Sequence, residues 1–139
     1  MAGKFSFRRF SEINLSDPFF NSLKEDYPGN ENSTGFEPWF QKKAAQGATA
    51  LVFDDDMGLG AFVYLKVENE PIELESSTLP AIPRIKIGTL RLAERYRGQR
   101  LGEGAIGLAL WHWQKSRTQE VYVTVFERHD TLIGLFERF

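Results

Sequence analysis

The chain has 139 residues, of which 42% are hydrophobic and 26% are charged, with a formal net charge of −2 and no cysteine. This length predicts a single domain, 1–139, that buries about two-thirds of its unfolded surface. The absence of cysteine excludes a disulfide scaffold, a cysteine-ligated zinc site and a cysteine nucleophile. With only two histidines, no metal site is expected. The chain has no long apolar run, which predicts a cytoplasmic protein without a signal or membrane span.

The first part of the chain predicts a strand followed by two helices. Weak alternation of apolar residues predicts a strand over Lys4–Phe10. Asp17 and Pro18 are typical of a helix start, because aspartate caps free amides and proline lacks an N–H that would be unpaired there. A second helix is expected over Glu37–Gln46, with Gly47 as its C-terminal stop.

A hairpin and a long polar connection follow. The arms are expected over Thr49–Phe53 and Gly60–Val67, around a turn at Asp54–Gly58. Three consecutive aspartates in this turn suggest calcium, but the calcium-loop pattern needs acidic residues at alternate positions, which favours a solvated turn. Residues Asn69–Pro83 predict a polar connection without regular structure.

The second half predicts two strands and two helices. The strands are expected over Arg84–Ala93 and Val121–Phe126, and the helices over about Leu101–Lys115 and over Thr131–Phe139. The first of these strands has apolar residues at Ile85 and Ile87 and then at Leu90 and Leu92, so that its alternation slips by one. A β-bulge at Gly88–Thr89 would repair the slip, and the alternative is a strand buried on both faces.

A basic, glycine-rich segment joins this strand to the next helix. Free amides at a helix start and the helix dipole favour an anion there, and Arg97 and Arg100 suit phosphate oxygens. The alternative is a solvated surface loop. A P-loop is excluded because Glu103 follows Gly102 where lysine is required. The G-x-G-x-x-G match at Gly102–Gly107 begins too far after the strand for a dinucleotide fold.

The segment Tyr96–Gly102 resembles the acyl-CoA pyrophosphate loop of the GNAT superfamily of N-acetyltransferases. That motif is Gln/Arg-x-x-Gly-x-Gly/Ala; Arg97 matches its first position and Gly102 its last, while Arg100 replaces the middle glycine. The order of predicted elements is also that of the family. The resemblance implies an α/β (α+β) fold with a central mixed, mostly antiparallel sheet, a bulged strand and flanking helices.

The resemblance further implies transfer of an acetyl group from acetyl-CoA to a primary amine, by direct attack in a ternary complex. Cofactor contacts would come from the bulged strand, whose backbone would receive the pantetheine arm. They would also come from the loop, the start of the following helix and a second motif. These residues are Leu90, Arg91, Leu92, Arg97, Gly98, Gln99, Arg100, Leu101, Gly102, Glu103, Gly104 and His129. The acceptor would be a small-molecule or peptide amine, and the chain offers Tyr27 and Trp39 as weak candidates to line its pocket.

The sequence departs from the family at two positions that have been assigned to proton transfer in some members. Phe136 occupies the position of a tyrosine often proposed as the general acid, and Arg84 stands where some members have a glutamate base. No catalytic residue is therefore assigned. These departures keep open an alternative, a non-catalytic acyl-CoA-binding or protein-interaction module. A basic-patch nucleic-acid binder using Arg91, Arg95 and the two loop arginines is less favoured, because the chain is slightly acidic overall.

The resemblance also implies a hairpin after the last helix, and the sequence ends before it. We therefore expect strand Val121–Phe126 to have an open edge, covered by a second copy in a homodimer or by sequence beyond this chain.

Overall fold

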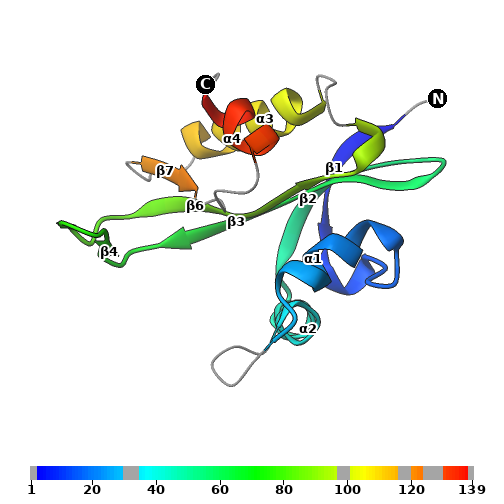
Figure 1. Ribbon diagram of the computed structural model, residues 1–139, viewed down its shortest axis with the longest axis horizontal. Helices are drawn as coiled ribbons and strands as arrows, with labels where there is room; N and C mark the ends of the chain where they lie inside the picture. Colours follow the sequence, from blue (N-terminus) through cyan, green and yellow to red (C-terminus); the bar gives the residue numbers. More distant parts are fainter. Residues whose placement is uncertain (1–2, 30–34, 97–100, 116–119, 124–129, 138–139) are drawn as a thin grey trace. The chain divides into compact units, whose positions relative to one another are not determined.

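The computed structural model describes residues 3–29, 35–96, 101–115, 120–123 and 130–137 (Figure 1). Its main sheet has five strands in the order β1-β2-β3-β6-β7. β1 and β2 are antiparallel, whereas β6 and β7 are parallel. The strands are β1 (Lys4–Arg9), β2 (Thr49–Asp55), β3 (Gly58–Glu68), β6 (Arg84–Leu92) and β7 (Glu120–Val123). The predicted mixed α/β fold is confirmed.

The helices agree with the predictions to within a few residues where the structure describes them. They are the short η1 (Phe10–Glu12), η2 (Pro18–Phe20) and η3 (Glu94–Tyr96), and α1 (Asn21–Asp26), α2 (Phe36–Ala45), α3 (Leu101–Lys115) and α4 (Asp130–Glu137). The predicted polar connection instead contains a small hairpin, β4 (Ile72–Glu73) and β5 (Thr78–Leu79). The chain divides into two compact units, Met1–Phe62 with Arg91–Arg95, and Val63–Leu90 with Tyr96–Phe139.

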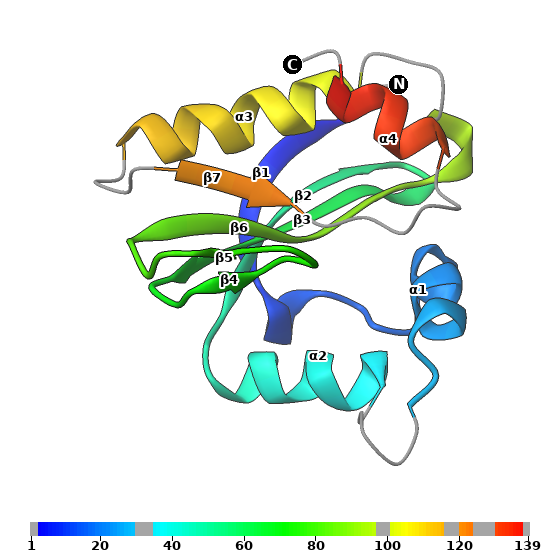
Figure 2. The same ribbon diagram turned by 60° about the vertical axis from the view of Figure 1, so that its left-hand side comes forward.

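The core of the first unit is built from phenylalanine rings. Phe10, Phe20 and Phe62 are 1%, 0% and 0% exposed. The Phe20 ring centroid lies 5.6 Å from that of Phe40 and 5.5 Å from that of Phe62. Helix α2 contributes Phe36 and Phe40, which are four residues apart and so share one helix face. Figure 2 shows α2 and α1, which are in contact with each other.

Glycines with positive φ set the ends of elements in this unit. Gly47, with φ +74°, follows α2 as predicted, and a side chain there would meet no atom within 4 Å. Gly58 opens β3 with φ +108°, and a Cβ there would lie 2.9 Å from Oδ2 of Asp17. Glycine at position 58 thus permits both the turn and the close approach of the Asp17 carboxylate.

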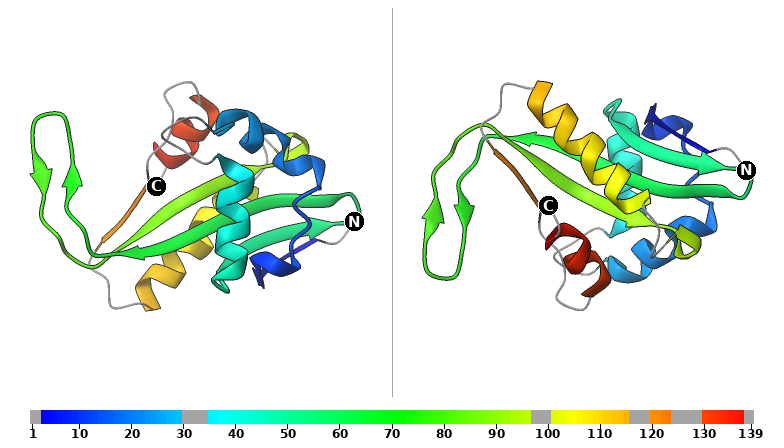
Figure 3. Two further views of the ribbon diagram at one scale, coloured as in Figure 1. Left: turned by 90° about the horizontal axis from the view of Figure 1, so that it is seen from below. Right: turned by 90° about the horizontal axis from the view of Figure 1, so that it is seen from above.

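The core of the second unit lies between its part of the sheet and α3. Ile85 and Ile87 of β6 are buried, as are Ala105 and Ile106 of α3 and Leu135 of α4. Helix α3 contacts both α4 and β7. The β4–β5 hairpin extends beyond the ends of β3 and β6, which it connects (Figure 3).

The burial pattern of β6 changes phase where the sequence predicts it. Ile87 and Leu90 are buried, Gly88 is exposed and Thr89 lies between these extremes. A Cβ on Gly88 would approach the Tyr64 ring to 3.1 Å, so a side chain there would displace the ring. The parallel pairing of β6 with β7 runs from Arg84 to Ile87 in the described residues. The bulge itself stays a prediction.

Candidate functional site

The last part of β6 is tied to the first unit by an ion pair. Nη2 of Arg91 donates to Oδ2 of Asp26 at 2.7 Å, and the two side chains are only 13% and 15% exposed. Asp26 is the last residue of α1. Two residues further on, the amide of Ala93 donates to the carbonyl of Gly60 at 2.8 Å. The strand end that is predicted to contact the cofactor is therefore held by both α1 and β3.

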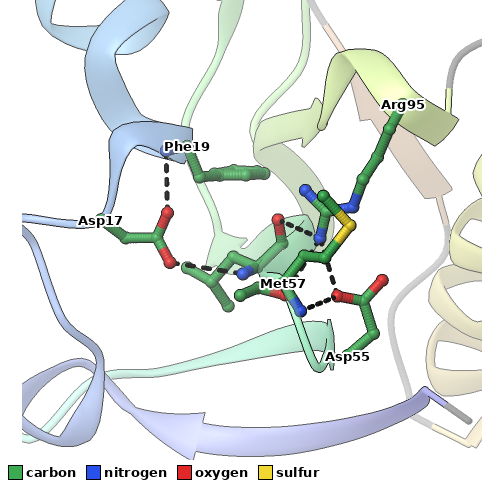
Figure 4. Close-up of polar contacts among 7 residues, drawn as sticks. Asp17, Phe19, Asp55, Met57 and Arg95 are labelled. Carbon is green, nitrogen blue, oxygen red and sulfur yellow. Dashed lines mark hydrogen bonds and ion pairs between the residues drawn. The ribbon is translucent and has the colours of Figure 1, made fainter. Parts of the chain in front are cut away.

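A second arginine, Arg95, binds the turn between β2 and β3 (Figure 4). Its Nη2 donates to Oδ1 of Asp55 at 3.0 Å and to the carbonyls of Gly58 and Leu59 at 3.1 and 3.2 Å. The Asp55 carboxylate also accepts from the amide of Met57 at 2.8 Å, and its side chain is 0% exposed. The prediction of a solvated aspartate turn is therefore wrong for Asp55, which neutralises an arginine.

The other acidic groups near this turn also have protein partners. Asp54 pairs with Arg8 of β1 at 2.8 Å. Asp17 accepts from the amide of Phe19, which confirms its predicted capping role, and from the amide of Leu59 at 3.3 Å (Figure 4). Within the described part of the chain, no cluster of three or more His, Cys, Asp or Glu residues could hold a metal ion.

The ion pairs of Arg91 and Arg95 bear on the hypothesis of a basic nucleic-acid patch. Both side chains face carboxylates rather than solvent alone, so two of the four arginines of that patch are neutralised. These pairs therefore weigh against a nucleic-acid surface built on the four arginines.

The second unit contains the start of α3, where the resemblance puts the pyrophosphate. α3 begins at Leu101, and Gly102 is buried whereas Gly104 is exposed. The first four amides of an α-helix lack acceptors within the helix and carry the positive end of its dipole, so they suit an anion. Arg97–Arg100 and His129, which complete the predicted cofactor set, lie outside the described residues.

The remaining predicted site residues are divided between the two units. Leu90 is buried in the second unit, while Arg91 and Leu92 belong to the first and are half-buried. Trp39 packs against Phe10 and its ring centroid is 5.7 Å from that ring, so at least one side of it faces the aromatic core. Tyr27 is 45% exposed.

A polar cluster that the sequence did not predict spans β3, β6 and β7. The hydroxyl of Tyr122 on β7 donates to the carboxylate of Glu68 on β3. Lys66 lies 3.3 Å from the same carboxylate, and the ammonium of Lys86 is 5.9 Å from the centre of the Tyr122 ring. The register pairs Lys86 with Tyr122 across the parallel strands. The strand register brings these residues together, and no local sequence motif predicts the cluster.

The contacts in this cluster shift the pKa values of Glu68 and Tyr122 in the directions that oppose proton transfer at neutral pH. The hydrogen bond from Tyr122 lowers the pKa of Glu68, with help from Lys66. Burial, followed by the bond to Glu68, raises the pKa of Tyr122 to about 12. Glu68 is thus a weakened base and Tyr122 a weakened acid, so the pair acts as a structural link across the sheet.

Replacing Tyr122 with phenylalanine should cost stability in a pH-dependent way. Because the pKa of Glu68 is lowered in the fold, this carboxylate contributes stability at pH values above its ordinary pKa of 4.5. That contribution is lost as the pH falls through the lowered pKa. Because the pKa of Tyr122 is raised in the fold, this hydroxyl contributes stability at pH values below its ordinary pKa of 10.0. That contribution is lost as the pH rises toward the raised pKa of about 12. The unmodified protein should therefore have a higher Tm than Tyr122→Phe, by a constant difference from about pH 6 to 9. This difference should become smaller at lower and at higher pH. A gap independent of pH would contradict the bond.

Arg84 also has a structural role where the resemblance has a base in some members. Its side chain is 3% exposed, its Nε donates to Oε1 of Glu120 at 2.6 Å, and its Nη1 donates to the carbonyl of Pro80 at 2.8 Å. The residue thus joins β6 to β7 and to the connection after β5. A guanidinium has five N–H donors and no acceptor, so Arg84 cannot replace a glutamate as a base.

No protein-family model and no curated protein sequence matches the chain. Among the helices that the structure describes, none combines the length and apolar character needed to cross a bilayer. Solved structures, however, match it over almost its whole length.

Acetyltransferases are among these structures, and three of them are described here. An aminoglycoside acetyltransferase from an uncultured soil metagenomic sample, in complex with trehalose, has a TM-score of 0.67 and 13% identity, covering 98% of this chain and 86% of that one. Ribosomal-protein-alanine N-acetyltransferase from Brucella melitensis has a TM-score of 0.67 and 12% identity, covering 99% and 90%. An aminoglycoside N-acetyltransferase in complex with CoA has a TM-score of 0.61 and 9% identity, covering 99% and 88%. The chain thus has the fold of the GNAT acetyltransferases, as the resemblance of its sequence implied.

Proposed function

We propose that residues 1–139 form one acetyltransferase domain that transfers an acetyl group from acetyl-CoA to a primary amine. The observation that carries the proposal is that α3 begins at Leu101, inside the segment Tyr96–Gly102 that resembles the acyl-CoA loop. The helix start therefore supplies free amides at the position where the motif needs them. The fold shared with acetyltransferases, one of them in complex with CoA, supports the same cosubstrate.

In this mechanism the chain contributes binding and orientation more than proton transfer. The amine nitrogen attacks the thioester carbonyl directly, and a backbone amide of β6 near Leu90–Leu92 stabilises the oxyanion. Phe136 cannot protonate the departing thiolate, and Glu68 is engaged with Tyr122. We therefore infer that an ordered water deprotonates the amine, and that water, His129 or another residue protonates the departing thiolate.

The acceptor is proposed only as a class. The similar structures include enzymes named for aminoglycosides and for a ribosomal-protein alanine, both of which carry amino groups. For this chain we propose a small-molecule or peptide amine, bound near Tyr27 and Trp39 of the first unit. β7 is an edge strand among the described residues, and we propose that a second copy or a further segment of chain covers it.

Isothermal titration with acetyl-CoA tests the cosubstrate. Arg97→Ala is expected to weaken binding about tenfold, because a charged hydrogen bond to phosphate contributes about 1.5 kcal/mol or more. Lys42→Ala is the matched control, since it removes one exposed positive charge from α2, which is no part of the motif, and should leave the affinity unchanged. Absence of binding by the unmodified protein, or equal losses in both variants, would contradict the proposal.

A non-catalytic acyl-CoA-binding module is the second candidate, and the replacement of a tyrosine by Phe136 favours it. The two are separated by measuring CoA release with a panel of amines: aminoglycosides, polyamines, amino acids and peptides with free N-termini. Release with any of them supports the enzyme. Tight binding of acetyl-CoA with no release across the panel would instead support the module.

A further inference from the structure

Every second residue of the segment Arg91–Arg95 binds another element of the first unit. Arg91 binds Asp26 at the end of α1, the amide of Ala93 binds Gly60 of β3, and Arg95 binds Asp55 at the end of β2. Two of these three contacts are ion pairs between residues that are 65 and 40 positions apart in the sequence. The backbone of this segment is therefore fixed from three separate elements.

The two carboxylates involved are more enclosed than a typical surface ion pair. The Asp55 side chain is 0% exposed and that of Asp26 is 15% exposed, whereas Asp54, next to Asp55 on β2, is 32% exposed and pairs with Arg8 of β1. Enclosed pairs are poorly screened by solvent, and removal of one partner leaves a charge without compensation. The two enclosed pairs therefore restrain the segment more strongly than the Asp54 pair restrains β1.

We infer that Asp26 and Asp55 are positioning residues that hold the backbone of Arg91 and Leu92 in the geometry that receives the pantetheine arm of acetyl-CoA. This inference rests on the proposed function, which assigns that backbone to the cofactor. A site of this kind needs its backbone placed to within about 0.5 Å, and groups that touch no ligand supply that precision. In this role Asp26 and Asp55 act through their ion pairs with Arg91 and Arg95.

The test separates the pantetheine arm from the nucleotide end of the cofactor. Binding of acetyl-CoA and of adenosine 3′-phosphate 5′-diphosphate, which lacks pantetheine, is measured for Asp26→Asn, Asp55→Asn and Asp54→Asn. The first two variants should bind acetyl-CoA about three- to tenfold more weakly and the nucleotide unchanged. Asp54→Asn removes the same charge from the neighbouring position and should change neither affinity.

The outcomes distinguish this inference from the proposed function. If the unmodified protein binds no acetyl-CoA, both fail. If it binds, but Asp26→Asn and Asp55→Asn match Asp54→Asn, or weaken both ligands equally, the positioning role is wrong and the proposed function stands. Loss of thermal stability alone would show a structural role only. Should Asp55→Asn fail to fold, the comparison of Asp26→Asn with Asp54→Asn decides the question.

Discussion

Replacing Gly102 with valine is expected to weaken acetyl-CoA binding by about a hundredfold or more, which corresponds to about 2.7 kcal/mol. Gly102 is the second residue of α3 and is buried, and its amide is one of those that lack an acceptor within the helix. A pyrophosphate bound at a helix start must approach the backbone closely. A branched side chain at this position would keep the phosphate oxygens away from the amides. Calorimetric titration measures the loss.

Gly107→Val is the matched control on the same helix. Gly107 is exposed, and a Cβ there would meet no atom within 4 Å outside the backbone of its own helix. The same chemical change is thus made in the same helix but away from its start. Acetyl-CoA affinity should stay within about twofold of the unmodified protein. Equal losses in Gly102→Val and Gly107→Val would show that the start of α3 does not bind the cofactor.

Replacing Phe20 with alanine is expected to lower the free energy of unfolding by about 3–5 kcal/mol. The Phe20 ring is 0% exposed, and its centroid lies 5.7 Å from that of Phe36 and 5.5 Å from that of Phe62. Loss of the ring removes buried apolar surface and leaves a cavity between η2, α2 and β3. Urea denaturation followed by tryptophan fluorescence measures the change.

Phe7→Ala provides the control for this effect. Phe7 lies on β1 and is 54% exposed, so its replacement by alanine should cost less than about 1 kcal/mol. If Phe20→Ala were no more destabilising than Phe7→Ala, the aromatic cluster would not be the main core of the first unit.

The elements whose signals are local were predictable from the sequence. Asp17 caps the helical segment that begins at Pro18, and Gly47 follows α2 with positive φ, both as expected. The bounds of α3, Leu101–Lys115, are those predicted. Capping, glycine turns and the 3.6-residue period depend on neighbours a few positions away, so a linear reading contains the information they need. The sequence does not predict the β4–β5 hairpin, because its strands are two residues long, three of their four residues are exposed, and they have no apolar pattern.

The part of the candidate site that can be described divides in the same way. The resemblance of the segment Arg97–Gly102, together with the order of the predicted elements, is enough to predict the fold class. No local pattern predicts that Arg91 and Arg95 bind Asp26 and Asp55, or that Tyr122 bonds to Glu68. These partners are 40 to 65 positions apart, so strand register and packing bring them together. Side chains that look like free charges in the sequence are therefore paired in the folded chain.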